Sequence, residues 1–228
     1  RVISDLEQSH PAGAVILGTE LQKNQIGAFK QIPFPVVFID TFYPYTSFDF
    51  VDMDNQDAVY LVLREFVEQG HTDIGMITTH VEVENFRQRV RGFHKAREAL
   101  NLPPDCTKID VDSTFDGAYA NFGRYLDNGG RLPGALFCSN DIIAFGCMRA
   151  LTERNIRIPE DVSLIGFDNL PQAEMSAPPL TTIDVKKHRI GSTAMSILIE
   201  RIEAEEPFPP MKVSIGASLV RRKSVLSI

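Results

Sequence analysis

The sequence predicts an α/β fold built on a doubly wound parallel sheet. Short apolar runs with the length of buried strands alternate along the chain with stretches of helical periodicity. The clearest example is the segment 135–169, in which an apolar strand, a helix and a second apolar strand follow one another. Neighbouring parallel strands need such a crossover, which is right-handed almost without exception. Asn140 and Asp168 follow the two strands, and ligands bind beyond the carboxyl ends of such strands, so we expect both to face one crevice.

Each predicted strand is a short apolar run bounded by turn residues. These runs are 12–18, 33–40, 50–54, 73–79, 108–111, 135–139, 162–167, 180–184, 213–215 and 217–220. Each predicted helix carries apolar residues three or four positions apart. The helices are 1–8, 24–31, 55–69, 86–100, 116–128, 141–155 and 188–205. The segment 172–179, which has no clear period, is predicted to be a loop.

Capping and breaking residues set the helix boundaries. Asn140 offers a side-chain oxygen to the first turn of the helix that follows it. Gly70 is placed to close the preceding helix in a left-handed conformation. The pair Gly129-Gly130 ends another helix, and Pro103-Pro104 breaks the chain before the strand 108–111.

Composition excludes several classes of protein. The 228 residues carry a net charge of −7, whereas a surface that binds DNA by itself should be basic. No apolar run approaches the ~20 residues of a membrane span, and no glycine-rich phosphate loop or nucleophile motif is present. Of three cysteines, Cys138 and Cys147 lie in apolar segments, so we expect small buried side chains rather than metal ligands. We therefore expect no cofactor, no metal, no membrane and a cytoplasmic protein.

The segment 135–169 and its surroundings resemble the effector-binding domain of the lactose-repressor/galactose-repressor family of bacterial transcription regulators. The matching positions are Phe137, Asn140, Asp141, Ala144, Gly146, 150–151, 159–163, 166–168 and 178–182. Further matches are Gln69-Gly70-His71, Arg91-Gly92-Phe93 and Leu219-Val220-Arg221-Arg222. These positions run in order from about Asp54 to the end of the chain.

The resemblance implies two doubly wound lobes joined by three crossovers, as in type I periplasmic binding proteins. Carried onto this sequence, the amino-terminal lobe is 1–53 plus 184–216, and the carboxy-terminal lobe is 54–183 plus 217–228. In the family a DNA-binding headpiece and further elements of the first lobe precede the point at which this sequence opens. We therefore expect an incomplete amino-terminal lobe, and operator DNA to be bound by a headpiece outside this chain.

The resemblance also supplies candidate effector-binding residues. Arg89 occupies the family position whose guanidinium contacts the effector, and its planar fork of donors suits hydroxyls or a ring carbonyl. Asp168 is an acceptor, and Asn140 is either a ligand contact or a helix cap. Phe115 is either a surface on which a sugar or base stacks or a core residue, and Asn85 adds a polar contact.

Phe145 and Met175 lie in segments that match the dimer interface of the family, so a homodimer is expected. Arg87, Arg89 and Arg91 alternate along one helix, so not all three can face the same cleft.

The first functional hypothesis is an effector-sensing domain of a repressor that binds a sugar or sugar derivative, or a purine as second candidate, between its lobes. The alternative is a periplasmic sugar-binding protein of a transporter, which shares the fold. A third reading, an enzyme, lacks a nucleophile with an adjacent base.

Overall fold

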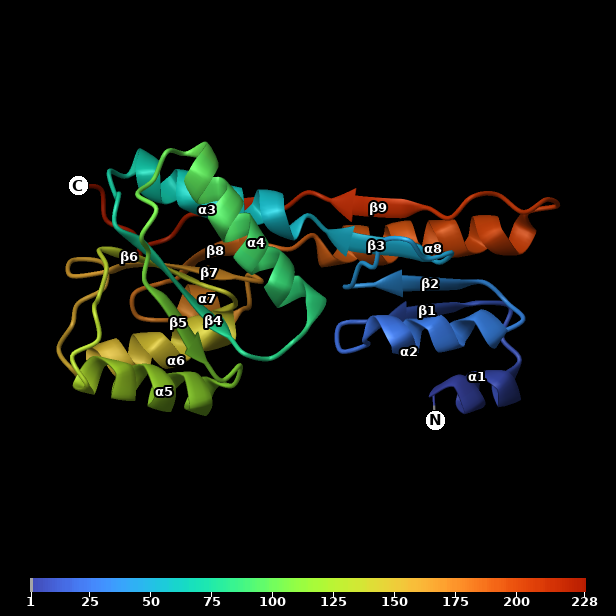
Figure 1. Cartoon of the computed structure of the whole chain (residues 1–228), viewed down its shortest axis with the longest axis horizontal. Coiled ribbons are helices and arrows are strands. Elements are labelled where there is room, and N and C mark those ends of the chain that lie inside the picture. Colours follow the sequence, from blue (N-terminus) through green and yellow to red (C-terminus); the bar gives the residue numbers. More distant parts are fainter. Residues whose placement is uncertain (1) are drawn as a thin grey trace. The chain divides into compact units, whose positions relative to one another are not determined.

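The structure, a computed structural model, describes residues 2–228 and has the α/β architecture that the sequence predicts (Figure 1). The chain divides into two compact units. The first unit consists of the chain up to Asp54, Val83–Asn85 and Lys186–Gly216; the second consists of Asn55–Glu82, Phe86–Val185 and Ala217–Ile228. The lobe boundaries that the resemblance implies, after residues 53, 183 and 216, stay a prediction, and the grouping of residues 83–85 with the first unit was not anticipated.

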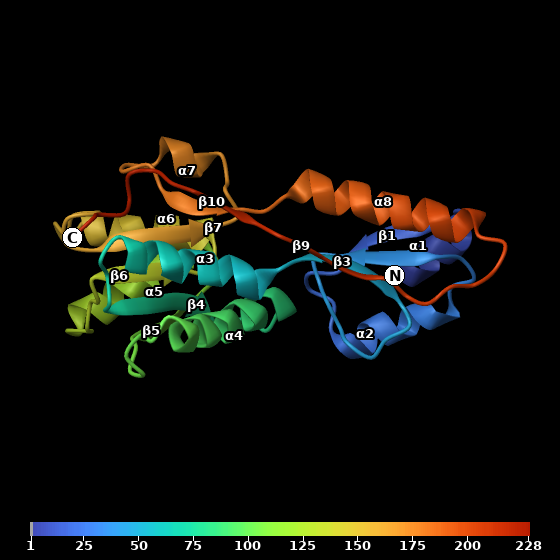
Figure 2. The same ribbon diagram turned by 90° about the horizontal axis from the view of Figure 1, so that it is seen from above.

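The first unit contains a four-stranded parallel sheet in the order β1-β2-β3-β9. Its strands are β1 (Ala14–Leu17), β2 (Val36–Ile39), β3 (Asp49–Met53) and β9 (Lys212–Ile215). Its helices are α1 (Val2–Ser9), α2 (Lys23–Gly27), the 3₁₀ helix η1 (Ala28–Gln31) and α8 (Lys187–Glu203). Helices α2 and α8 lie on opposite faces of this sheet (Figure 2).

The two faces of this sheet follow from the alternation of side chains along each strand. Phe38 and Phe50 are fully buried with stacked rings 5.5 Å apart, and they pack against Ile26 of α2. Val37 and Val51 alternate with them, so they lie on the opposite face, which α8 covers. Both faces are thus apolar, as expected for a parallel sheet covered on each side.

The second unit contains a six-stranded sheet in the order β10-β8-β7-β6-β4-β5. Its strands are β4 (Ile74–Thr79), β5 (Lys108–Val111), β6 (Ala135–Cys138), β7 (Ser163–Phe167), β8 (Thr181–Asp184) and β10 (Ser218–Val220). Its helices are α3 (Asn55–Glu68), α4 (Glu84–Ala99), α5 (Phe115–Asp127), α6 (Asp141–Thr152) and α7 (Gln172–Met175). Figure 1 shows α3 and α4 on one face of this sheet and α5 and α6 on the other.

The predicted crossover is present in this unit. Strands β6 and β7 pair in parallel, with Leu136 beside Leu164, and α6 connects them. Cys138 and Cys147 are completely buried in the core between this sheet and α6, as predicted. Gly70 has the predicted left-handed conformation, with φ of 97°.

Two details of this unit were not predicted. Strand β10 pairs antiparallel with β8 at the edge of a sheet whose other strands pair in parallel. The sequence does not reveal this direction because β10 is a three-residue edge strand that the chain reaches without a crossover helix. Gln172–Met175 forms the short helix α7 instead of loop, since a single turn is too short to show a helical period.

Across residues 2–228, none of the helices has both the length and the apolar character that crossing a membrane requires.

Candidate functional site

Arg89 lies on the buried face of α4 and is only 5% exposed. Its Nε donates to Oδ1 of Asn55 at 2.9 Å, and its Nη1 donates to the carbonyl oxygen of Ser139 at 2.6 Å. The guanidinium carbon lies 3.7 Å from the centre of the Phe167 ring. These contacts fix the plane of the guanidinium before any ligand arrives. Arg91 on the same helix is exposed, as the predicted alternation requires.

Asp168 follows β7 and faces Arg89. Its Oδ1 lies 3.6 Å from Nη2 of Arg89, and 28% of the Asp168 side chain is exposed. The two residues come from segments about 80 positions apart, yet they meet at one edge of the sheet. Asp168 has φ of 108° and Asn169 has φ of 47°, so the chain makes an unusual turn directly after the strand.

Asn140 lies two residues after the end of β6, next to Ser139, whose carbonyl oxygen accepts from Arg89. The side-chain oxygen of Asn140 accepts from the backbone N–H of Ile143 at 2.8 Å and caps α6. Of the two roles considered for Asn140, the structure shows the cap directly. The residue is half-buried and is the chain neighbour of a partner of Arg89, so it also borders the edge that Arg89 and Asp168 share.

Asp141 is completely buried at the start of α6. Its Oδ2 accepts from the backbone N–H of Leu170 at 2.8 Å, and its Oδ1 accepts from the hydroxyl of Thr182 at 2.6 Å. Burial raises the pKa of Asp141 to about 6; these hydrogen bonds oppose the shift, and the charge of Asp168 adds to it. The sequence analysis gave Asp141 no ligand role, and its position in the core agrees with this.

Asn85 belongs to the first unit and not to the unit that carries Arg89. Its Nδ2 donates to the backbone oxygen of Asp40 at 3.1 Å and to Oδ1 of Asp40 at 2.8 Å. Asp40 follows β2 and also accepts from the hydroxyl of Thr19. Asn85 is thus part of a polar set at the carboxyl end of the first sheet.

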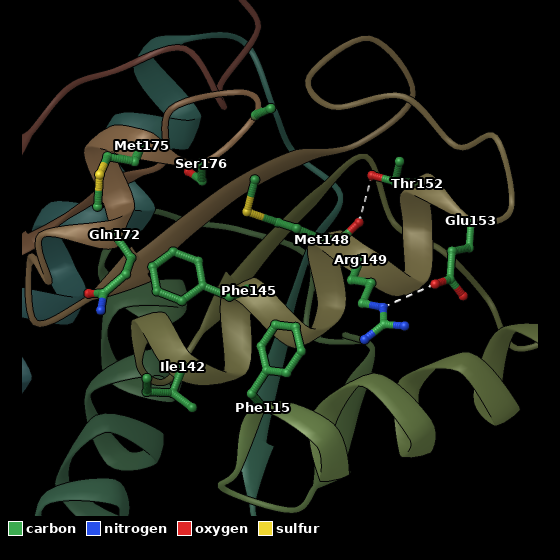
Figure 3. A pocket seen from close by; sticks show the side chains of 11 residues that line it. Phe115, Ile142, Phe145, Met148, Arg149, Thr152, Glu153, Gln172, Met175 and Ser176 are labelled. Atoms are coloured by element: carbon green, nitrogen blue, oxygen red, sulfur yellow. Dashed lines mark hydrogen bonds and ion pairs between the residues drawn. The ribbon is translucent and has the colours of Figure 1, made fainter.

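Phe115 is the first residue of α5 and is partly exposed. It lines an open depression together with Phe145 of α6 and Met175 of α7 (Figure 3). The remaining lining residues are Ile142, Met148, Arg149, Thr152, Glu153, Gln172, Ser176 and Ala177. Met175 is 75% exposed. Phe115 therefore lies beside the two predicted dimer residues, and its role as a stacking surface for the effector stays a prediction.

Sequence reasoning missed three residues that hold Arg89, namely Asn55, Ser139 and Phe167. Asn55 is buried at the start of α3 and Ser139 directly follows β6, so a polar residue at a strand-to-helix junction was the available signal. Among residues 2–228 no group of three or more His, Cys, Asp or Glu side chains is placed to hold a metal ion.

Comparison with known proteins identifies the family. Residues 63–225 match the model of the periplasmic binding protein-like domain, which is more than half of the chain. The chain belongs to this family. Within the family it is an effector-binding domain of the LacI type of transcription regulator, as the resemblance in the sequence implied.

The relatives named here are transcription regulators and not enzymes. The chain is 35% identical over 221 residues to the HTH-type transcriptional repressor PurR of Haemophilus influenzae, which covers 95% of this chain and 65% of that repressor. It is 31% identical over 218 residues to the PurR repressor of Actinobacillus pleuropneumoniae, with the same coverage. The chain therefore spans about two thirds of the length of these repressors.

Solved structures have the same fold. A LacI family transcriptional regulator from Enterococcus faecium with bound ribose superposes with a TM-score of 0.87 at 26% identity, over 100% of this chain and 84% of that chain. A lac repressor dimer bound to operator and an anti-inducer superposes with a TM-score of 0.86 at 24% identity, over 98% of this chain and 77% of that chain. The fold class, two parallel-sheet lobes of the periplasmic-binding-protein type, is confirmed.

Proposed function

We propose that this chain senses a small polar effector at the edge where Arg89 and Asp168 meet, and thereby controls DNA binding by a bacterial transcription regulator, as a repressor in the first instance. The observation that carries the proposal is the 3.6 Å approach of the Arg89 guanidinium to the Asp168 carboxylate beside a strand end. Ligand sites of open α/β sheets lie at such ends.

The chemistry of the pair suits a sugar. A guanidinium held in plane by Asn55 and Ser139 donates to hydroxyl oxygens, and the part-exposed carboxylate of Asp168 accepts from hydroxyl hydrogens. Adjacent sugar hydroxyls offer both partners in a fixed geometry. The ribose bound to the Enterococcus faecium regulator supports a sugar as the effector class. A purine, which also presents donors and acceptors on one edge, is the second candidate.

The role of the other predicted residues follows from this proposal. Asn140 is the chain neighbour of Ser139, which contacts Arg89, whereas Asn85 belongs to the first unit and its role as an effector contact stays a prediction. Hydrogen bonds within each unit hold both side chains in place: Asn140 caps α6, and Asn85 donates to Asp40, which follows β2. That the effector lies between the two lobes stays a prediction. The named relatives are repressors, which favours a cytoplasmic regulator over a transporter's binding protein.

The test compares two arginines of one helix. Ribose, other sugars, sugar phosphates and nucleobases are screened by thermal shift, since a ligand that binds the folded state raises the melting temperature. We expect Arg89→Lys to weaken binding of the selected ligand about ten- to hundredfold, because an ammonium lacks the planar fork of charge-assisted donors. Arg91→Lys, which changes an exposed arginine two positions away, should bind like the wild type.

Equal affinities of the Arg89→Lys and Arg91→Lys variants would contradict the assignment of Arg89.

A further inference from the structure

We infer that the buried carboxylate of Asp141, together with the hydroxyl of Thr182, is the positioning group that holds the turn after β7 and so aims Asp168 at the effector. This inference rests on the proposed function, because Asp168 is taken as a ligand contact. Asp141 itself is completely buried and faces the core.

The turn after β7 has an unusual backbone conformation. Asp168 and Asn169 both have positive φ, at 108° and 47°, a conformation that residues other than glycine rarely adopt. Such a turn persists only where surrounding contacts hold it in place. It comes directly after the fully buried strand residue Phe167, so it decides where the Asp168 side chain points.

Asp141 and Thr182 accept hydrogen bonds from this turn. The N–H of Leu170 donates to Oδ2 of Asp141 at 2.8 Å. The N–H of Asn169 donates to the hydroxyl of Thr182 at 3.4 Å, and that hydroxyl donates to Oδ1 of Asp141 at 2.6 Å. The Asp141 carboxylate therefore accepts directly from the N–H of Leu170, and it is linked through the Thr182 hydroxyl to the N–H of Asn169.

The carboxylate reaches the turn by lying against β7, and a Cβ atom at Gly166 would overlap Oδ1 of Asp141. Gly166 therefore leaves room for the carboxylate beside the strand. Burial raises the pKa of Asp141 to about 6, so keeping it ionised at neutral pH costs stability. A residue that only filled the core would avoid this cost, whereas an acceptor that shapes the turn requires the carboxylate oxygens.

The experiment uses the matched pair Asp141→Asn and Asp141→Leu, which have similar shapes. Asn keeps an oxygen for Leu170 and a polar partner for Thr182, whereas Leu removes both. We expect amide hydrogen exchange at Asn169 and Leu170 to be about tenfold faster or more in Asp141→Leu and close to wild type in Asp141→Asn. Ribose affinity, measured by calorimetry, should fall about tenfold in Asp141→Leu and stay within about threefold in Asp141→Asn.

A double-mutant cycle separates positioning from general destabilisation. If Asp141 acts through Asp168, then Asp141→Leu combined with Asp168→Asn should bind ribose within about twofold of Asp168→Asn alone. Full additivity, or wild-type affinity in Asp141→Leu, would overturn the inference. If Asp141→Leu does not fold, Thr182→Val replaces it, with Thr182→Ser as the variant that keeps the hydroxyl.

If the wild type binds no ribose, the sugar proposal fails, while amide exchange at Asn169 and Leu170 still decides whether Asp141 holds the turn. Unchanged exchange in Asp141→Leu and Thr182→Val would overturn the inference independently of any ligand.

Discussion

A buried guanidinium is costly unless its N–H groups are paired, and Arg89 has partners from three separate segments. The sequence could place Arg89 on a helix face and Asp168 at a strand end, because both follow from local periodicity. It could not show that Asn55 and Ser139 orient the guanidinium, since those contacts span 34 and 50 positions. Local sequence patterns therefore placed these residues on their elements but did not reveal the hydrogen bonds between distant segments.

The titration of Asp141 gives a testable consequence at this scale. Its pKa in the folded protein is raised from the ordinary 3.8 to about 6, so the protonated form is favoured by folding. Below about pH 4 Asp141 is protonated in both the folded and the unfolded protein, and its burial carries no ionisation cost. As the pH rises to about 6, the unfolded chain releases the proton while the folded protein retains it, so the free energy of unfolding falls. Two units of pKa correspond to about 3 kcal/mol.

We therefore expect the free energy of unfolding of the wild type, relative to Asp141→Asn, to fall by about 3 kcal/mol between pH 4 and pH 7. Urea unfolding at a series of pH values measures this difference. The opposite pH dependence of His71, whose pKa is lowered by burial, cancels because both proteins contain it. A difference that does not change with pH would show that Asp141 is not desolvated as the structure indicates.

At the scale of elements, the long periodic segments were predictable and the short ones were not. Helices α3 and α6 contain several turns, so their apolar periods are visible in the sequence. Helix α7 has four residues and β10 has three, too few for either a period or a strand direction to show. The sequence also could not predict that Phe115 lines a surface depression, because this follows from the packing of α5 against α6.

Helices α5, α6 and α7 together form the depression lined by Phe115, Phe145 and Met175, and we propose this depression as the homodimer interface. An exposed methionine beside two aromatic rings is the kind of apolar surface that subunits bury. We expect Met175→Asp to convert a dimer to a monomer, because it places a charge in the buried interface. Light scattering during gel filtration measures the mass.

The matched control is Met195→Asp on α8, where an exposed methionine of the other unit is replaced. If both variants or neither dissociate, the depression is not the specific interface.

For the whole molecule, the two-lobe architecture followed from the family resemblance, since composition alone showed no boundary. The proposed regulation involves the whole regulator, because an effector changes DNA binding only if it binds two arrangements of the regulator with different affinity. In a gel-shift assay with the full-length regulator and an operator selected from random DNA, the effector should change operator affinity at least about fivefold. The Arg89→Lys variant should bind the operator and show no response. Equal responses of both proteins would contradict effector sensing through Arg89.

The most direct test of the central claim is a crystal structure of the chain with the effector that the thermal-shift screen selects. The account predicts polar atoms of that effector within hydrogen-bonding distance of both the Arg89 guanidinium and the Asp168 carboxylate. An effector bound elsewhere, for example in the depression beside Phe115, with Arg89 and Asp168 still facing only each other, would contradict it.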